Sequence, residues 1–175
     1  RARAMAAALA AFAVGLGGGW FAARELPAPP AAALVAEATL AHRTFAVEVA
    51  HPVEVAATQQ DHLMRWLSKR LGRPLAAPDL SPHGFRLMGG RLLPGGAGAA
   101  AQLMYEDGSG RRLTLYVEVA EGGATAFRFA QSGGEATFAW VDRGFGFAVT
   151  APAAREALLP IAESVYRQFG APPAS

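Results

Sequence analysis

The chain of 175 residues contains no cysteine, and charged residues make up only 17% of it. Without cysteine there is no disulfide framework, no thiolate zinc site and no cysteine nucleophile. The formal net charge is only +2, and Arg1 and Arg3 account for all of it. The sequence pI is near 9.5, yet no basic stripe remains to hold a phosphate backbone. We therefore expect no direct binding of nucleic acid.

Apolar residues make up 52% of the chain, too many for a disordered polypeptide of low net charge. The longest uncharged run covers residues 4–23, between Arg3 and Arg24. As a helix it would reach about 30 Å, the thickness of a bilayer core. Arg1 and Arg3 precede it, so the positive-inside rule places the N-terminus in the cytoplasm and the rest of the chain outside. These features predict a transmembrane anchor over residues 1–24.

Two other interpretations of the apolar run stay open, a cleaved signal peptide and a buried alanine-rich helix. The signal peptide fits less well, because the run is long and Phe21 stands where a small residue is needed for cleavage. Gly15 and Gly19 form a G-x-x-x-G motif that would allow a homodimer through the span. In a segment so rich in alanine and glycine, such a motif also arises by chance.

Four parts follow from the sequence pattern. After the anchor at 1–24 we expect a proline linker and juxtamembrane helix at 25–43, an α+β sensor domain at 44–170 and a disordered tail at 171–175. Within the domain, alternation predicts a strand at residues 44–49, and a period of 3.6 predicts an amphipathic helix at 59–71 that ends at Gly72. The basic side of that helix is either solvated or in contact with acidic headgroups; it comprises Arg65, Lys69, Arg70 and Arg73.

From Gly84 onward the apolar period changes to two, with turn signals about ten residues apart, and a last helix follows Pro152 and ends near Phe169. The expected fold class is therefore α+β. One N-terminal transmembrane helix is followed by an antiparallel β-meander sheet of five or six strands, packed by flanking helices. Aromatic residues keep one parity in three of these strands and predict a core face, with a ligand pocket as the alternative. They are Phe127, Phe129, Phe138, Trp140, Phe145 and Phe147.

Residues with catalytic or metal-binding chemistry form no recognisable pattern. No two of the four histidines (His42, His51, His62, His83) have helical metal-ligand spacing, and Asp79 with His83 brackets a proline. Glu106 and Asp107 precede Gly108 and predict a turn, while the glycines at residues 95–98 do not join a strand to a helix. No serine has the nucleophile-elbow context; the serines considered are Ser68, Ser81, Ser109, Ser132 and Ser164. We expect no enzyme, no catalytic or metal site and no cofactor.

Eight segments in sequence order carry a family resemblance. They are HPVEV at 51–55, HLMRWLSKRLG at 62–72, FRLMGGRLLP at 85–94, AQLMYED at 101–107, RLTLYV at 112–117, FAWVD at 138–142, GFGFAV at 144–149 and VYRQ at 165–168. Together they resemble the extracytoplasmic half of proteobacterial single-pass anti-sigma factors, over about residues 45–169. No one segment is specific by itself.

The resemblance implies a noncatalytic regulator in the bacterial inner membrane, with a cytoplasmic N-terminus and a periplasmic C-terminal sensor domain. Its main partner would be an extracytoplasmic-function sigma factor, held by an N-terminal segment that this chain lacks. Many members carry a His-x-x-x-Cys-x-x-Cys zinc motif in that segment, so no sigma-binding or zinc residue is assigned here. The alternative is a tethered periplasmic binding module or envelope protein without a transcriptional role. The gene sequence upstream of Arg1 separates the two, since a start codon at Met5 would exclude the regulator.

The linker prolines Pro27, Pro29 and Pro30 interrupt helical continuity between the expected span and the domain. Rotation or piston motion is therefore a poor means of transmission. We expect regulation by proteolysis of an exposed segment at residues 24–41, with envelope proteases as further partners. The alternative is that this segment is only a spacer.

Overall fold

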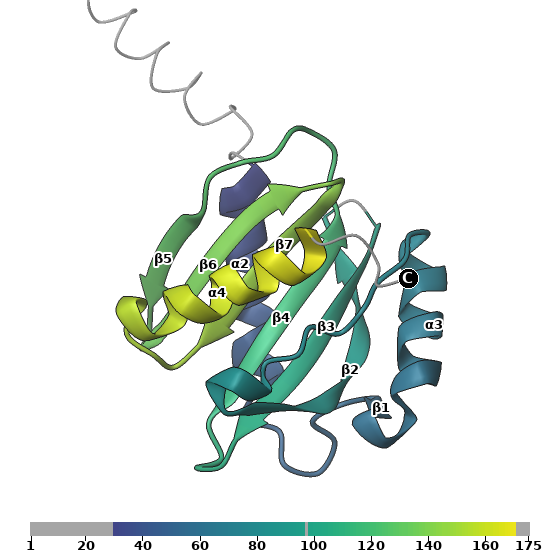
Figure 1. Cartoon of the computed structure of the whole chain (residues 1–175), viewed down its shortest axis with the longest axis vertical. Helices are drawn as coiled ribbons and strands as arrows, with labels where there is room; N and C mark the ends of the chain where they lie inside the picture. Colours follow the sequence, from purple (N-terminus) through teal and green to yellow (C-terminus); the bar gives the residue numbers. More distant parts are fainter. Residues whose placement is uncertain (1–29, 97, 171–175) are drawn as a thin grey trace, which may run out of the picture.

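The computed structural model describes residues 30–96 and 98–170, which form three α-helices and one antiparallel sheet of seven strands (Figure 1). The helices are α2 (Pro30–Phe45), α3 (Gln60–Leu71) and α4 (Arg155–Gly170). The strands are β1 (Val55–Ala56), β2 (Phe85–Gly95), β3 (Gly98–Asp107), β4 (Arg112–Val119), β5 (Arg128–Ser132), β6 (Glu135–Asp142) and β7 (Phe145–Ala151). Short 3-10 helices cover Ala57–Gln59 and Ser81–His83.

The strand order is β1-β2-β3-β4-β7-β6-β5, so the expected single meander of five or six strands is wrong. Two series of hairpins meet where β4 pairs with β7, and Leu115 lies opposite Val149 in that pairing. The connection from β4 to β5 does not make a tight hairpin. It runs past β6 instead, where Thr125 and Val141 exchange two hydrogen bonds. Strand β1, which the sequence analysis did not predict, has only two residues, too few to show an apolar period.

Helices lie on both faces of the sheet, with α4 crossing in front and α2 behind in Figure 1. The last helix, predicted after Pro152, is α4; Leu158, Ile161, Ala162 and Val165 are buried on it, and Pro160 lies exposed inside it. Leucines of α3 extend the same apolar cluster toward β2 and β3. Gly72 ends α3 in the left-handed conformation, as its position predicted.

The strand expected at residues 44–49 is also wrong. Thr44 and Phe45 complete helix α2, and the chain then turns, leaving Val47 and Val49 exposed. Alternating valines mark a strand only when one side of the segment is covered by a core. Here neither valine is covered.

The expected membrane helix and inner-membrane location are corrected by the helices of the described part. None of its helices is long and apolar enough to cross a bilayer. The two longest, α2 and α4, have 16 residues each. At about 1.5 Å per residue they fall short of a hydrocarbon core of about 30 Å. The run at 4–23 with its Gly15 and Gly19 motif, the linker at 25–29 and the tail at 171–175 lie outside the described residues.

Candidate binding site beneath helix α2

Helix α2 lies close to the sheet because small side chains face each other. Leu34, Ala38 and Ala41 pack on a second buried cluster with three sheet alanines and one tyrosine: Ala100, Ala139, Ala148 and Tyr116. A Cβ added at Gly146 would come within 3.1 Å of the Leu34 side chain, so even one more carbon there meets the helix. This interface depends on close approach and buries few large side chains.

A buried polar row runs across three strands under the same helix. The Thr137 hydroxyl lies 3.0 Å from that of Thr150 and 3.1 Å from that of Thr39 in α2. Next to them, His42 Nδ1 lies 2.9 Å from the Thr114 hydroxyl. Burial of the ring lowers the pKa of His42 to about 4, opposed by the charge of Glu135 and assisted by that of Arg43. His42 is therefore neutral at pH 7.

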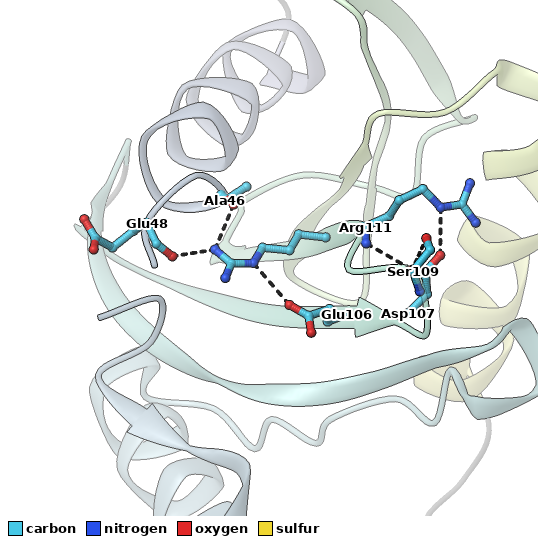
Figure 2. Close-up of polar contacts among 7 residues, drawn as sticks. Ala46, Glu48, Glu106, Asp107, Ser109 and Arg111 are labelled. Atoms are coloured by element: carbon cyan, nitrogen blue, oxygen red, sulfur yellow. Dashed lines mark hydrogen bonds and ion pairs between the residues drawn. The ribbon is translucent and has the colours of Figure 1, made fainter. Parts of the chain in front are cut away.

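The chain after α2 crosses the same face toward β1 and is held to the sheet by two arginines. Arg112 at the start of β4 donates to the carbonyl oxygens of Ala46 and Glu48, and its Nε faces Glu106 (Figure 2). Arg91 in β2 donates to the carbonyl oxygen of His51 at 2.8 Å, with its guanidinium 3.6 Å from the centre of the Phe45 ring. We call residues 46–54 the strap.

Between α2 and the end of β2 lies a groove of about 470 Å³. Its apolar walls come from the helix and from the strand, and its polar end from three further residues. The walls are Leu40, Ala41, Thr44 and Phe45 on one side and Leu93, Pro94 and Gly95 on the other; the end is Glu37, Gly96 and Tyr116. A volume of this size fits a small organic molecule.

Two carboxylates share the same hydrogen-bond donors at the polar end. The Gly96 amide donates to Glu37 Oε2 at 3.1 Å and to Glu118 Oε2 at 3.2 Å. The Tyr116 hydroxyl donates to Glu37 Oε2 at 3.0 Å and lies 3.5 Å from Glu118 Oε2. Burial, followed by the charge of Glu37, raises the pKa of Glu118. Burial also raises the pKa of Tyr116, so its hydroxyl stays protonated and remains a donor.

Beside the groove, two side chains on the same face of the sheet keep unused hydrogen-bonding groups. Gln102 is 1% exposed, and within the described part neither its amide nitrogen nor its amide oxygen has a partner. In register it lies between Arg91 of β2 and Tyr116 of β4. The Nε of Arg91 is likewise buried without a partner in that part. Such groups cost free energy when left unpaired.

The residues that sequence reasoning considered for chemistry are separated in the structure. His42 is buried under α2, His51 lies in the strap, His62 is exposed on α3 and His83 ends a 3-10 helix. Asp79 accepts a hydrogen bond from the Ser81 amide in the turn that precedes that 3-10 helix. Among residues 30–96 and 98–170, no group of three His, Cys, Asp or Glu side chains is placed to hold a metal ion.

Of the acidic pair before Gly108, Asp107 closes the turn that follows β3, whereas Glu106 lies within the strand opposite Arg112. Asp107 Oδ1 accepts from the amides of Ser109 and Arg111 and from the Ser109 hydroxyl (Figure 2). These donors, led by the Ser109 hydroxyl, hold the pKa of Asp107 below its usual range. The Asp107 carboxylate also pairs with Arg111 at 2.7 Å.

The other serines have structural contacts. Ser68 and Leu75 exchange hydrogen bonds through the Ser68 hydroxyl. The carbonyl oxygen of Ser132 accepts from Arg43, and the Ser164 hydroxyl accepts from Gln168. The aromatic face predicted as core is buried at Phe138, Trp140, Phe145 and Phe147 and half-buried at Phe127 and Phe129.

Sequence reasoning missed Glu37, Tyr116 and Glu118. The alternation of β4 does place Tyr116 and Glu118 on one face, which was an available signal. Glu37, however, reaches them from 79 residues away, and only the docking of α2 brings it there. The structure also explains glycine at position 95, because a Cβ there would come within 2.8 Å of Glu118 Oε2.

No protein-family profile matches the chain, and no curated protein matches it in sequence.

Proposed function

We propose that this chain contains the regulatory domain of an anti-sigma factor that controls an extracytoplasmic-function sigma factor. The observation that carries the proposal is the ordered set of eight segments that resembles this family. Seven of these segments lie in or overlap β1, α3, β2, β3, β4, β6 and β7, and the last lies in α4. They therefore belong to one folded unit.

Helix α2 is the element through which such a domain would act on the part of the protein that precedes it. It is the first described element, and its contact with the sheet rests on alanines and hydroxyls. Residues 30–41, part of the segment expected to be cut by proteases, are helical and packed on the sheet. Cleavage in this part requires local unfolding, because a protease needs an extended backbone. In this proposal the signal undocks α2.

A second candidate, a binding module without a transcriptional role, is favoured by the groove between α2 and β2. The two candidates differ in whether changes in α2 alter transcription. A regulator transmits undocking to the sigma factor, whereas a binding module does not.

The test uses the complete gene and a reporter that depends on the cognate sigma factor. Ala38→Leu places a larger side chain at a position that is 0% exposed under α2, while Ala36→Leu makes the same change on the exposed side of the helix. We expect Ala38→Leu to raise reporter activity several-fold and Ala36→Leu to leave it unchanged. Equal reporter activity for both variants, with no sigma factor co-purifying with the protein, contradicts the regulatory function and favours the binding module.

A further inference from the structure

Helix α2 and the strap cover different parts of one face of the sheet, and the groove lies between α2 and β2. Helix α2 packs over β4, β5, β6 and β7, while the strap crosses toward β1 and is held there by Arg112 and Arg91. The groove lies on the β2 side of α2, and Tyr116 of β4 contributes to its lining. Helix α2 and the strap are thus held on the sheet by separate sets of contacts.

Two acidic side chains meet at the polar end of the groove, where Glu37 belongs to the lining and Glu118 lies next to it. Glu37 and Glu118 direct their Oε2 atoms at the same two donors, the Gly96 amide and the Tyr116 hydroxyl. Within residues 30–96 and 98–170, no Lys, Arg or His forms an ion pair with either carboxylate. Burial, the charge of Glu37 and a hydrogen bond to the Glu37 side chain raise the pKa of Glu118, and a cation beside the pair would instead favour the ionised form of both groups.

The remainder of the groove is apolar and reachable from solvent. Leu40 lines the groove from α2 and is 68% exposed. Leu93 and Pro94 face it from β2. An apolar body lying between these residues would leave its charged end at Glu37.

An independent observation concerns Gln102, which lies beside Tyr116 on this face of the sheet. Its amide is 99% shielded from solvent, and in the described part of the chain it has no hydrogen-bond partner. Buried amides without partners are rare in folded proteins and mark places where a further polar group is accommodated. Gln102 does not line the groove itself, but its strand neighbour Tyr116 does, and Tyr116 also donates to Glu37.

We propose that the groove binds a small organic amine with an apolar body, whose ammonium group is held by Glu37 and Glu118. The apolar body lies along Leu40, Phe45 and Leu93. Charge complementarity selects this ligand over an anionic amphiphile, which would meet two carboxylates, and over a neutral alcohol, which gains no ion pair. This proposal rests on the regulatory function only for its consequence in transcription, because binding is a property of the domain itself.

The test measures binding of n-hexylamine to the purified chain by calorimetry, with n-hexanol and hexanoate as matched probes. We expect the amine to bind at least tenfold more tightly than the alcohol, and hexanoate not to bind. Extending the amine by one methylene is expected to improve affinity about fourfold while the groove has room. Equal affinity for hexylamine and hexanol, or tighter binding of hexanoate, overturns the proposal.

Three variants place the ligand in the groove. Glu37→Gln is expected to weaken hexylamine binding about tenfold. Glu156→Gln, the same change at an exposed position of α4, should leave the affinity unaltered. Leu40→Ser is expected to weaken binding about threefold, and it preserves folding because Leu40 is exposed. Unchanged affinity in both Glu37→Gln and Leu40→Ser places the amine elsewhere and overturns the site. If calorimetry shows binding but the amine does not change the activity of a sigma-dependent reporter, the regulatory function is contradicted while the binding site is confirmed.

Discussion

The two faces of the sheet are built from different materials. The face under α4 and α3 contains large apolar side chains, including Trp140, Phe138 and Phe147, together with leucines from three strands and two helices. The face under α2 contains mainly alanines, with the threonine row and His42 beside them. Both faces are buried, yet only the first removes much apolar surface from water. The first face therefore contributes more of the apolar burial that stabilises the fold than the second.

This difference follows from how free energy scales in each kind of contact. Burial of apolar area contributes roughly 25 cal/mol per Å², so large side chains dominate the total. An alanine interface gains less area and depends on fit, and its hydroxyl pairs contribute only about 1 kcal/mol each. A helix docked in this way is a better candidate for a regulated contact than one docked on aromatic rings.

The largest predicted effect comes from removing the centre of the aromatic face. Trp140 is 1% exposed and stacks on Phe147 at 5.3 Å, with Phe127 at 4.8 Å on another side. We expect Trp140→Ala to lower the free energy of unfolding by about 3–5 kcal/mol, because it leaves a large cavity. Chemical denaturation followed by circular dichroism measures the loss. Trp66→Ala, at a half-buried position in α3, is the control and should cost clearly less.

The aromatic face was also the part that the sequence predicted best. Apolar side chains of one parity within a strand, such as Phe138 and Trp140 in β6, indicate one buried face. Helix α4 was predicted equally well, because large apolar residues that recur with a period of 3.6 indicate an amphipathic helix. In both cases local pattern and tertiary burial agree.

The next prediction tests the α2 face through pH. The pKa of His42 falls from 6.5 to about 4 on folding, so the unfolded chain takes up the proton first as the pH is lowered. Stability supplied by neutral His42 is complete above pH 6.5 and is lost as the pH falls toward 4. The loss amounts to about 3 kcal/mol by the linkage relation.

Denaturation curves at pH 7, 6, 5 and 4 measure this dependence. Other groups titrate in the same range, and Glu118 has a raised pKa that acts in the opposite direction, so the wild type is compared with His42→Gln. Glutamine keeps a hydrogen-bonding side chain near Thr114 but does not titrate. Parallel pH curves for the two proteins would show that His42 is not buried as described.

Sequence could not predict this second face. The strand residues Thr114, Thr137 and Thr150 lie on three strands, and their meeting depends on β4 pairing with β7. Turn signals indicate where strands end but not which strands become neighbours, so the expected meander gave the wrong adjacency. The groove followed the same rule, because Glu37 reaches Tyr116 and Glu118 only after α2 has docked. The pairing of strands that are far apart in the sequence cannot be inferred from the pattern of any short segment, whereas the period of a single helix or strand can.

A smaller effect is expected from overfilling the α2 face. Ala148 is 0% exposed and lies opposite Tyr116 on one side and Ala139 on the other. Ala148→Leu should cost about 1–3 kcal/mol, because the added carbons force α2 away from the sheet. Hydrogen exchange should accelerate in α2 more than in α4. Ala76→Leu, at an exposed position, is the control, and uniform acceleration in both helices would remove the distinction between the faces.

The smallest predicted effect separates the hydroxyl row from the alanine packing around it. Thr137 is 1% exposed, and its hydroxyl connects those of Thr39 and Thr150. Thr137→Val keeps the shape but leaves the buried Thr150 hydroxyl without this partner, which should cost about 1–2 kcal/mol. In Thr137→Val with Thr150→Val, no unpaired buried hydroxyl remains at this pair, so the double variant should lose less stability than the sum of the single ones. Strictly additive losses in denaturation would mean that the two hydroxyls do not depend on each other and that the α2 face is held by packing alone.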